Sequence, residues 1–137
     1  DALRKKGYEI SWEYQGDYSF KSGETAYGDI SKKELTKLGV FSSNDQMALG
    51  FLHTALENGN RIPGDFGVIG YDNMPYSKVF YPKLSTIGTN LDVLAETTLD
   101  SLRNSVKNEK TKKQNSTTTL LPVEIVKRRT HANDETK

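Results

Sequence analysis

Residues 40–50, VFSSNDQMALG, contain the transition from strand to helix that decides the fold class. The segment starts with apolar residues that fit a short buried strand and ends in a helix with one apolar face. The apolar positions of this helix recur at helical spacing: Ala48, Phe51, Leu52, Ala55 and Leu56. A polar turn, SSND at 42–45, joins the two elements. A strand that passes into a helix through so short a turn is typical of an α/β unit.

The same alternation of strand and helix continues on both sides of this segment. The predicted strands span residues 8–15, 39–43, 66–71, 84–87 and 120–126. The predicted helices are one that ends at Gly7, one over residues 20–29, the one after Asp45, and one with an apolar stripe of Leu91, Leu94, Ala95, Leu99, Leu102 and Val106. Residues 127–137 are expected to form a solvated tail. This order of elements predicts an α/β fold with a mainly parallel sheet.

Composition narrows the class of protein. With 137 residues the chain has the length of about one domain, and its hydrophobic content of 34% is enough for a core. A net charge of +1 provides no strong field to attract nucleic acid or an acidic membrane. There is no cysteine, which excludes disulfides and thiolate metal sites and is compatible with a reducing compartment. No apolar run is long enough to cross a bilayer, and the first residues do not resemble a signal peptide.

Polar side chains cluster where the predicted strands end: Asp17 and Tyr18, Asn44 and Asp45, and Asp72 and Asn73. In parallel α/β sheets, ligands bind outside the carboxyl ends of the strands. We therefore expect these side chains to face one rim of the sheet. Carboxylates accept hydrogen bonds from hydroxyls, Asn both donates and accepts, and an aromatic ring stacks on the apolar face of a sugar. The set suits a neutral, hydroxyl-rich ligand.

Each of these residues also has a purely structural interpretation. Asp45 directly precedes a helix, where a side chain that caps the N-terminus is more common than a ligand group. Asn44 and the pair Asp72–Asn73 are compatible with turns, and Tyr18 is compatible with a place in the core. Only their convergence on one edge of the sheet favours a binding site.

Signatures of catalysis and metal binding are missing from the sequence. There is no GxSxG, P-loop or GxGxxG motif. The two histidines, His53 and His131, have no second histidine or cysteine nearby with which to bind a metal. The aspartates of the predicted rim could form an acid–base set, but nothing supplies a nucleophile. The lysine-rich residues 107–117 contain no aromatics, which favours a solvated loop over a nucleic-acid site. We expect no catalytic residue, no metal and no cofactor.

Four segments, taken in order, resemble a single family. They are SSNDQMALG at 42–50, IPGDFGVIGYDN at 62–73, PKLSTI at 82–87 and LLPVEIVKRRT at 120–130. In this order and spacing they resemble the effector-binding part of the lactose-repressor family of transcription regulators, from residue 1 to about residue 130. The resemblance implies one lobe of the type I periplasmic-binding-protein-like fold, a three-layer, Rossmann-like α/β architecture. It assigns residues 1–85 to the C-terminal lobe, 86–118 to a crossover segment that belongs to the first lobe, 119–130 to the last strand of the C-terminal lobe and 131–137 to a disordered tail.

The resemblance also implies which residues bind the effector. Tyr18 matches an aromatic position that stacks on the effector, and Asn44 and Asp72 match positions that bind its hydroxyls. Asn90 falls on or beside a position that touches the effector from the hinge side, although Leu91 stands where the family often has an aromatic. Asp45 is then mainly the helix cap, which fixes the strand end so that Asn44 points at the cleft.

The function implied by the resemblance is sugar-effector binding and dimerisation within a cytoplasmic transcription repressor. Leu49 and Phe80 match the surfaces through which family members form homodimers. Operator DNA would be bound only through a headpiece upstream of the chain, and no membrane partner is expected. A periplasmic-type sugar receptor for transport is the alternative, and an α/β enzyme is a third reading. The resemblance leaves the sugar open, with ribose as one candidate.

Overall fold

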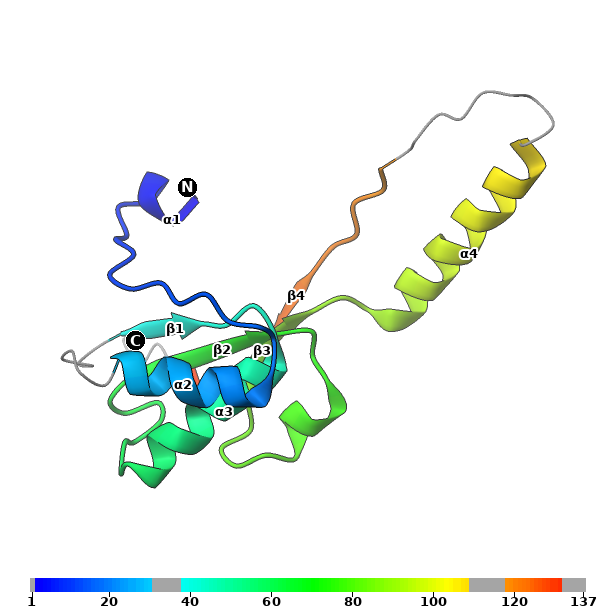
Figure 1. Ribbon diagram of the computed structural model, residues 1–137. Coiled ribbons are helices and arrows are strands. Elements are labelled where there is room, and N and C mark those ends of the chain that lie inside the picture. Colours follow the sequence, from blue (N-terminus) through cyan, green and yellow to red (C-terminus); the bar gives the residue numbers. More distant parts are fainter. Residues whose placement is uncertain (1, 31–37, 109–117, 132–137) are drawn as a thin grey trace, which may run out of the picture.

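The computed structural model describes residues 2–30, 38–108 and 118–131 (Figure 1). Its sheet has the strand order β1 (Gly39–Phe41), β2 (Gly67–Tyr71), β3 (Ser85–Gly88) and β4 (Glu124–Val126). The first three strands are parallel and β4 is antiparallel to β3. The expected α/β class and mainly parallel sheet are therefore confirmed.

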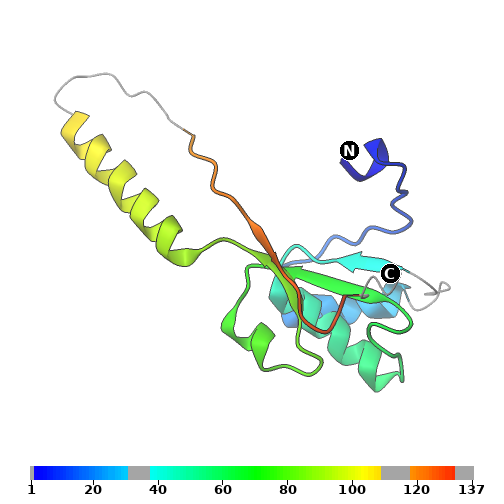
Figure 2. The same ribbon diagram turned by 180° about the vertical axis from the view of Figure 1, so that it is seen from behind.

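Two helices, α2 (Phe20–Ile30) and α3 (Asp45–Glu57), lie together on one face of the sheet. The view from behind shows the strands in front of these helices (Figure 2). Among the described residues, both helices that pack on the sheet lie on this one face. The opposite face has no described helix on it, so the sheet and the described helices supply two of the three expected layers. The opposite face carries apolar side chains that are partly exposed: Phe41, Ile69, Tyr71, Ile87 and Ile125.

The core lies between α2, α3 and the sheet. Val68 of β2 and Leu84, which precedes β3, are fully buried there. Phe51 of α3 makes edge-to-face contacts with Tyr27 of α2 and with Phe66, an arrangement that aromatic rings prefer. The core therefore joins both helices to the central strands.

The two helices approach each other at glycines. A Cβ atom added to Gly50 would lie 2.0 Å from the carbonyl oxygen of Phe20, and one added to Gly23 would lie 2.0 Å from the carbonyl oxygen of Met47. Both contacts are near the N-termini of the helices. The close packing therefore brings the residues just before α2 next to those just before α3.

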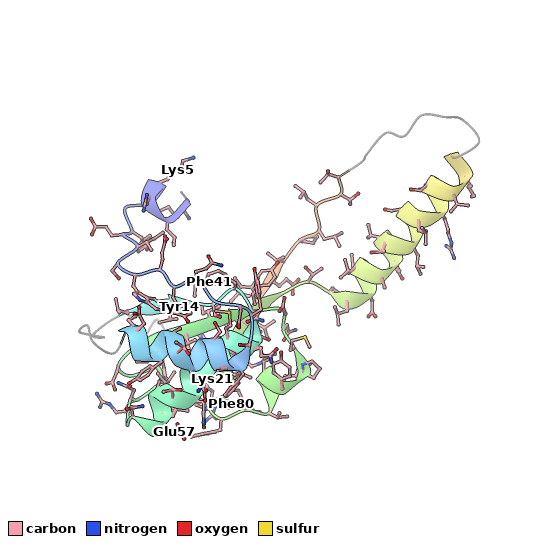
Figure 3. All side chains as sticks on the ribbon, viewed as in Figure 1. Lys5, Tyr14, Lys21, Phe41, Glu57 and Phe80 are labelled. Carbon is pink, nitrogen blue, oxygen red and sulfur yellow. The ribbon has the colours of Figure 1, made fainter. Side chains whose placement is uncertain are left out.

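The helix predicted from the apolar stripe is α4 (Leu91–Asn108), and it extends away from the sheet (Figures 1 and 3). Its apolar residues lie on the surface, with Leu91 72%, Leu102 60% and Val106 61% exposed. Monomeric proteins rarely expose so many apolar side chains together. No helix in the described part of the chain is both long and apolar enough to span a membrane.

The predicted strand over residues 8–15 is wrong. Between α1 (Ala2–Lys5) and α2 the chain runs as an irregular segment outside the sheet. The four residues expected on one strand face do not share one environment, because Trp12 and Tyr14 pack against the core whereas Tyr8 and Ile10 are exposed. The packing of Trp12 and Tyr14 occurs without strand pairing.

The prediction of a solvated tail from residue 127 is also wrong for its first part. Thr130 is fully buried, its Oγ1 donates to the Val68 carbonyl at 2.7 Å, and its own carbonyl accepts from Val68 N. His131 Nδ1 lies 2.8 Å from Ser85 Oγ. These contacts attach the segment beside β2 and β3. The rest of the predicted tail, residues 132–137, and most of the predicted loop 107–117 lie outside the described residues.

Candidate functional site

Three of the four predicted binding residues lie along one rim of the sheet. Asn44 follows β1, Asp72 follows β2, and these strands are parallel neighbours with Phe41 paired to Ile69. Asn44 Nδ2 donates to the Tyr18 carbonyl at 2.9 Å, which places the turn before α2 beside the end of β1. Together these contacts form an edge with an aromatic ring, an amide and a carboxylate.

The sequence predicted that Asp45 caps the helix, but in the structure the cap is Asn44. Asn44 has an extended backbone, and its Oδ1 accepts from Met47 N at 2.9 Å, so it is the N-cap of α3. Asp45 is already inside the helix and is fully buried. It accepts from Thr86 Oγ1 at 2.5 Å and from Met74 N at 2.7 Å. Asp45 therefore fixes β3 and the loop after β2, and the ligand role of Asn44 stays a prediction.

Asp72 and Asn73 form the part of the rim that follows β2. Both have a left-handed backbone, with φ of 103° and 53°, and the Asp72 side chain is exposed. Asp72 N donates to the Ile87 carbonyl at 2.8 Å, and Asn73 N donates to Thr86 Oγ1 at 3.3 Å. The loop is thus attached to β3 through its own backbone, and the Asp72 side chain stays exposed at the rim, where its ligand role remains a prediction.

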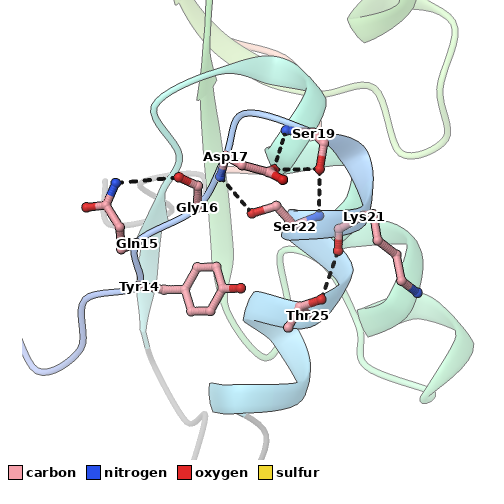
Figure 4. A pocket seen from close by; sticks show the side chains of 8 residues that line it. All are labelled: Tyr14, Gln15, Gly16, Asp17, Ser19, Lys21, Ser22 and Thr25. Carbon is pink, nitrogen blue, oxygen red and sulfur yellow. Dashed lines mark hydrogen bonds between the residues drawn. The ribbon is translucent and has the colours of Figure 1, made fainter.

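Tyr18 lies in a turn built by its neighbours. Its backbone is also left-handed, with φ of 67°, and 62% of the residue is exposed. Asp17 Oδ1 accepts from Ser19 N at 2.9 Å and from Ser19 Oγ at 2.6 Å, as Figure 4 shows. These hydrogen bonds from Ser19 lower the pKa of the Asp17 carboxyl. The turn presents the ring to solvent, and so Tyr18 is not a core residue.

An open pocket lies beside the rim, on the first turns of α2 (Figure 4). Its lining consists of Tyr14, Gln15, Gly16, Asp17, Ser19, Lys21, Ser22 and Thr25. The three rim residues Tyr18, Asn44 and Asp72 are not part of this lining. The pocket is therefore a neighbour of the predicted site and not the site itself.

Asn90, the fourth predicted binding residue, lies beyond the carboxyl end of β3. It follows β3 and precedes α4, and its Oδ1 accepts from Asp92 N at 2.9 Å. Asn90 is thus the N-cap of α4, and its predicted contact with an effector stays untested.

The predicted dimer residues differ in accessibility. Leu49 is 5% exposed and belongs to the core of its own chain, so its side chain is not part of an accessible surface. Phe80 is partly buried against the same core. The apolar surface nearby consists instead of Tyr76, Val79 and Tyr81, which are 37%, 81% and 78% exposed.

Among the described side chains, no group of three His, Asp or Glu residues is arranged to hold a metal ion. Two residues that hold the rim loop were missed by sequence reasoning, Thr86 and Arg128. Arg128 Nη2 donates to Asn73 Oδ1 at 2.6 Å, and Nη1 donates to the Leu84 carbonyl at 2.6 Å. No local sequence pattern marks these contacts, because each joins segments far apart in the chain.

The buried carboxyl of Asp45 predicts a specific pH dependence. Burial raises its pKa above the usual 3.8, and the hydrogen bonds from Thr86 and Met74 oppose this only partly. Because the folded protein binds a proton on Asp45 more tightly than the unfolded chain does, this proton contributes to stability. The contribution is complete below pH 3.8 and is lost as the pH rises through the raised pKa. We therefore expect the wild type to lose stability relative to Asp45→Asn as the pH rises from about 4, by about 1.4 kcal/mol for each unit of raised pKa. Urea unfolding of both proteins across this range measures the difference, and a difference that stays constant or changes in the opposite direction contradicts the prediction.

Comparison with known proteins identifies the family. Residues 1–131 match the periplasmic binding protein-like domain. The chain belongs to this family. This chain is 38% identical over 104 residues to the HTH-type transcriptional repressor PurR of Escherichia coli O1:K1 / APEC, and to that of Salmonella arizonae. These matches cover 76% of this chain and 30% of each repressor, so the chain spans about a third of the length of these curated relatives.

Two solved structures superimpose on most of this chain. The lac repressor dimer bound to operator and the anti-inducer ONPF has a TM-score of 0.81 and 31% identity, over 96% of this chain and 44% of that one. A LacI family transcriptional regulator from Enterococcus faecium with bound ribose has a TM-score of 0.70 and 29% identity, over 85% of this chain and 42% of that one. The chain therefore corresponds to the C-terminal part of an effector-binding domain of the lactose-repressor type, as its motifs indicate.

Proposed function

We propose that this chain is the sugar-binding lobe of a transcription repressor and that the ligand lies against the rim of Tyr18, Asn44 and Asp72. The observation that carries the proposal is the similarity to the ribose-bound regulator, combined with a rim at the carboxyl ends of parallel strands. The relatives named above are transcription regulators, which favours a repressor over a transport receptor.

The chemistry of the rim supports a neutral, hydroxyl-rich ligand. The exposed Asp72 carboxylate accepts hydrogen bonds from hydroxyls, and the exposed Tyr18 ring offers a face for stacking. Asn44 Nδ2 already donates to Tyr18, which leaves its second N–H available to a sugar oxygen. The rim binds and orients a ligand and needs no reacting group.

The wider assignment follows the same proposal. Residues 1–85 and 119–130 form the C-terminal lobe, and 86–118 form a crossover to a first lobe. Operator DNA is bound by a helix-turn-helix outside these 137 residues, and the repressor acts in the cytoplasm. The exposed stripe of α4 supports the crossover assignment, since it is an apolar surface without a cover in the described structure.

Ligand titration followed by NMR tests the sugar site. Half of a two-lobed cleft supplies about half of the contacts, so we expect ribose or another monosaccharide to bind only in the millimolar range, with shifts at the amides of Tyr18, Asn44 and Asp72. Asp72→Ala should abolish these shifts, and Glu96→Ala, which removes an exposed carboxylate on α4, should preserve them. Binding of a nucleobase but of no sugar would contradict the ligand class.

The exposed apolar surfaces predict self-association. We expect a dimer through the surface of Tyr76, Val79 and Tyr81, with a second contribution from the α4 stripe. Burying one such side chain is worth roughly 1.5–3 kcal/mol, so Val79→Glu should weaken the dimer by at least about tenfold. Leu99→Glu tests the α4 stripe, and Leu3→Glu on α1 is an exposed control. Light scattering over a concentration series measures the effect, and a wild type that stays monomeric throughout refutes both surfaces.

A further inference from the structure

The rim loop after β2 has an uncommon backbone conformation. Asp72 and Asn73 both have positive φ, at 103° and 53°, and neither is glycine. A non-glycine residue in this region is uncommon, and two in succession need support from the surrounding structure. The support is a cluster of three side chains: Asp45 and Thr86, which are fully buried, and Arg128, which is partly buried.

The Thr86 hydroxyl connects the loop to a buried carboxylate. It donates to Asp45 Oδ1 and accepts from Asn73 N at 3.3 Å. The other oxygen of Asp45 accepts from Met74 N at 2.7 Å. One carboxylate thus holds the backbone immediately after Asp72 through two routes, one direct and one through the hydroxyl.

Arg128 holds the same loop through the Asn73 side chain. Its Nη2 donates to Asn73 Oδ1 at 2.6 Å, and its Nη1 donates to Ser77 Oγ at 2.9 Å. The Asn73 side chain therefore has a fixed charged partner, and its backbone N–H has Thr86. Both ends of this residue are occupied, which leaves the adjacent Asp72 as the exposed member of the pair.

The loop also touches the strand that leads to α4. A Cβ atom added to Gly88 of β3 would lie 2.6 Å from the Asn73 Cβ, so the loop packs directly on this strand. Asp72 N donates to the Ile87 carbonyl one residue earlier. A displacement of β3 at this point must therefore move the rim loop, and a displacement of the loop must move β3.

We propose that the cluster of Asp45, Thr86 and Arg128 positions Asp72 for the ligand and couples the rim to β3, the strand that enters α4. The proposal rests on the proposed function for the identity of the ligand, but the backbone geometry it describes exists without one. A ligand that favours one conformation of Asp72 then favours one position of the start of α4, and coupling of this kind is reciprocal.

NMR of the isotope-labelled 137-residue chain tests the positioning role directly. A positive φ gives a strong intraresidue NOE between the amide proton and Hα, and this readout needs no ligand. We expect Thr86→Val to lose this NOE at Asp72 and Asn73. Thr86→Ser, which has the same hydroxyl group, should show the NOE at both residues as wild type does. Thr130→Val is the matched control, since Thr130 is equally buried and its hydroxyl bonds Val68 and Ser85. It should lower the melting temperature and leave the rim NOEs intact.

A second pair of variants tests the coupling from the side of β3. Gly88→Ala should shift the amides of Asp72 and Asn73, whereas Gly39→Ala in β1, where a Cβ would meet nothing within 4 Å, should not. If Thr86→Val does not fold, the Gly88→Ala and Gly39→Ala pair still tests the coupling between the rim loop and β3. Rim NOEs that are unchanged in Thr86→Val, or rim amides that are unchanged in Gly88→Ala, overturn the proposal.

Ribose titration separates this inference from the proposed function. If wild type binds, Thr86→Val should weaken binding at least tenfold, and Thr86→Ser should bind within about threefold of wild type. Loss of the rim NOEs without any change in affinity overturns the positioning role. If wild type shows no sugar binding but the rim responds as expected, the sugar assignment fails and the structural coupling stands.

Discussion

Gly50→Ala is expected to destabilise the chain by about 3 kcal/mol, the upper end of the usual effect of overpacking a core. The added Cβ would lie 2.0 Å from the Phe20 carbonyl oxygen and 2.9 Å from its carbon, which are backbone atoms of α2. A flexible side chain could rotate away, but a backbone carbonyl can move only with its helix. The two helices would have to separate, and the core between them would lose its packing.

A glycine in the same pair of helices provides the control. At Gly28 of α2, an added Cβ would meet nothing within 4 Å. Alanine in a helix interior is favoured over glycine by about 0.5–1 kcal/mol, so Gly28→Ala should leave stability unchanged or raise it. Chemical denaturation of both variants measures the contrast. A Gly50→Ala protein within about 0.5 kcal/mol of wild type would show that the helices can separate at little cost, because a cost that small is a typical surface effect.

The same contact shows which parts of the fold the sequence could predict. The helical spacing of Ala48, Phe51 and Leu52 predicted α3 and its buried face, because burial of one face is a local, periodic property. The packing of Gly50 on Phe20 is not periodic and joins residues far apart in the chain. The sequence therefore predicts that these helices exist, but not that their backbones touch.

Two wrong predictions have a common physical cause. The alternation of Tyr8, Ile10, Trp12 and Tyr14 predicted a strand, and the polar composition after residue 127 predicted a solvated tail. In the first segment Trp12 and Tyr14 pack on the core without sheet hydrogen bonds. In the second, Thr130 is buried because distant partners satisfy its polar groups. Composition describes a segment by itself, whereas its burial depends on what lies beside it.

The candidate site divides in the same way. Topology alone placed Asn44 and Asp72 on one edge, since the carboxyl ends of parallel strands share an edge. Tyr18 reaches the same edge for a different reason, because the strand predicted before it is not formed and its carbonyl accepts from Asn44 Nδ2. The assignment of the cap to Asp45 failed by one residue. The geometry that decides between neighbours is the extended backbone of Asn44 and the direction of the Asp45 side chain, toward Thr86 at a separation of 41 residues. No sequence pattern encodes a contact at that range.

Arg128→Met is the second variant with a large expected effect, about 3 kcal/mol of lost stability. Methionine keeps an unbranched side chain of similar length but removes the hydrogen bonds to Asn73, Ser77 and the Leu84 carbonyl. Hydrogen bonds from a charged donor are worth roughly 1.5–3 kcal/mol each and are not additive, so the loss of three supports an estimate near the top of the single-bond range. Leu84 and Ser77 are fully buried. In the variant the Leu84 carbonyl therefore loses the arginine at a place from which water is excluded.

The neighbouring arginine separates this effect from a general loss of charge. The Arg129 side chain is exposed, and its backbone N–H, which donates to the Lys83 carbonyl, is unaffected by substitution. Arg129→Met should therefore change the free energy of unfolding by less than about 0.5 kcal/mol, as for surface substitutions in general. Thermal and urea unfolding of the two variants give the comparison. Equal effects would mean that Arg128 acts only through its charge. A large loss in Arg128→Met alone places the anchor of the C-terminal segment in these three hydrogen bonds, one of which also holds Asn73 in the loop after β2.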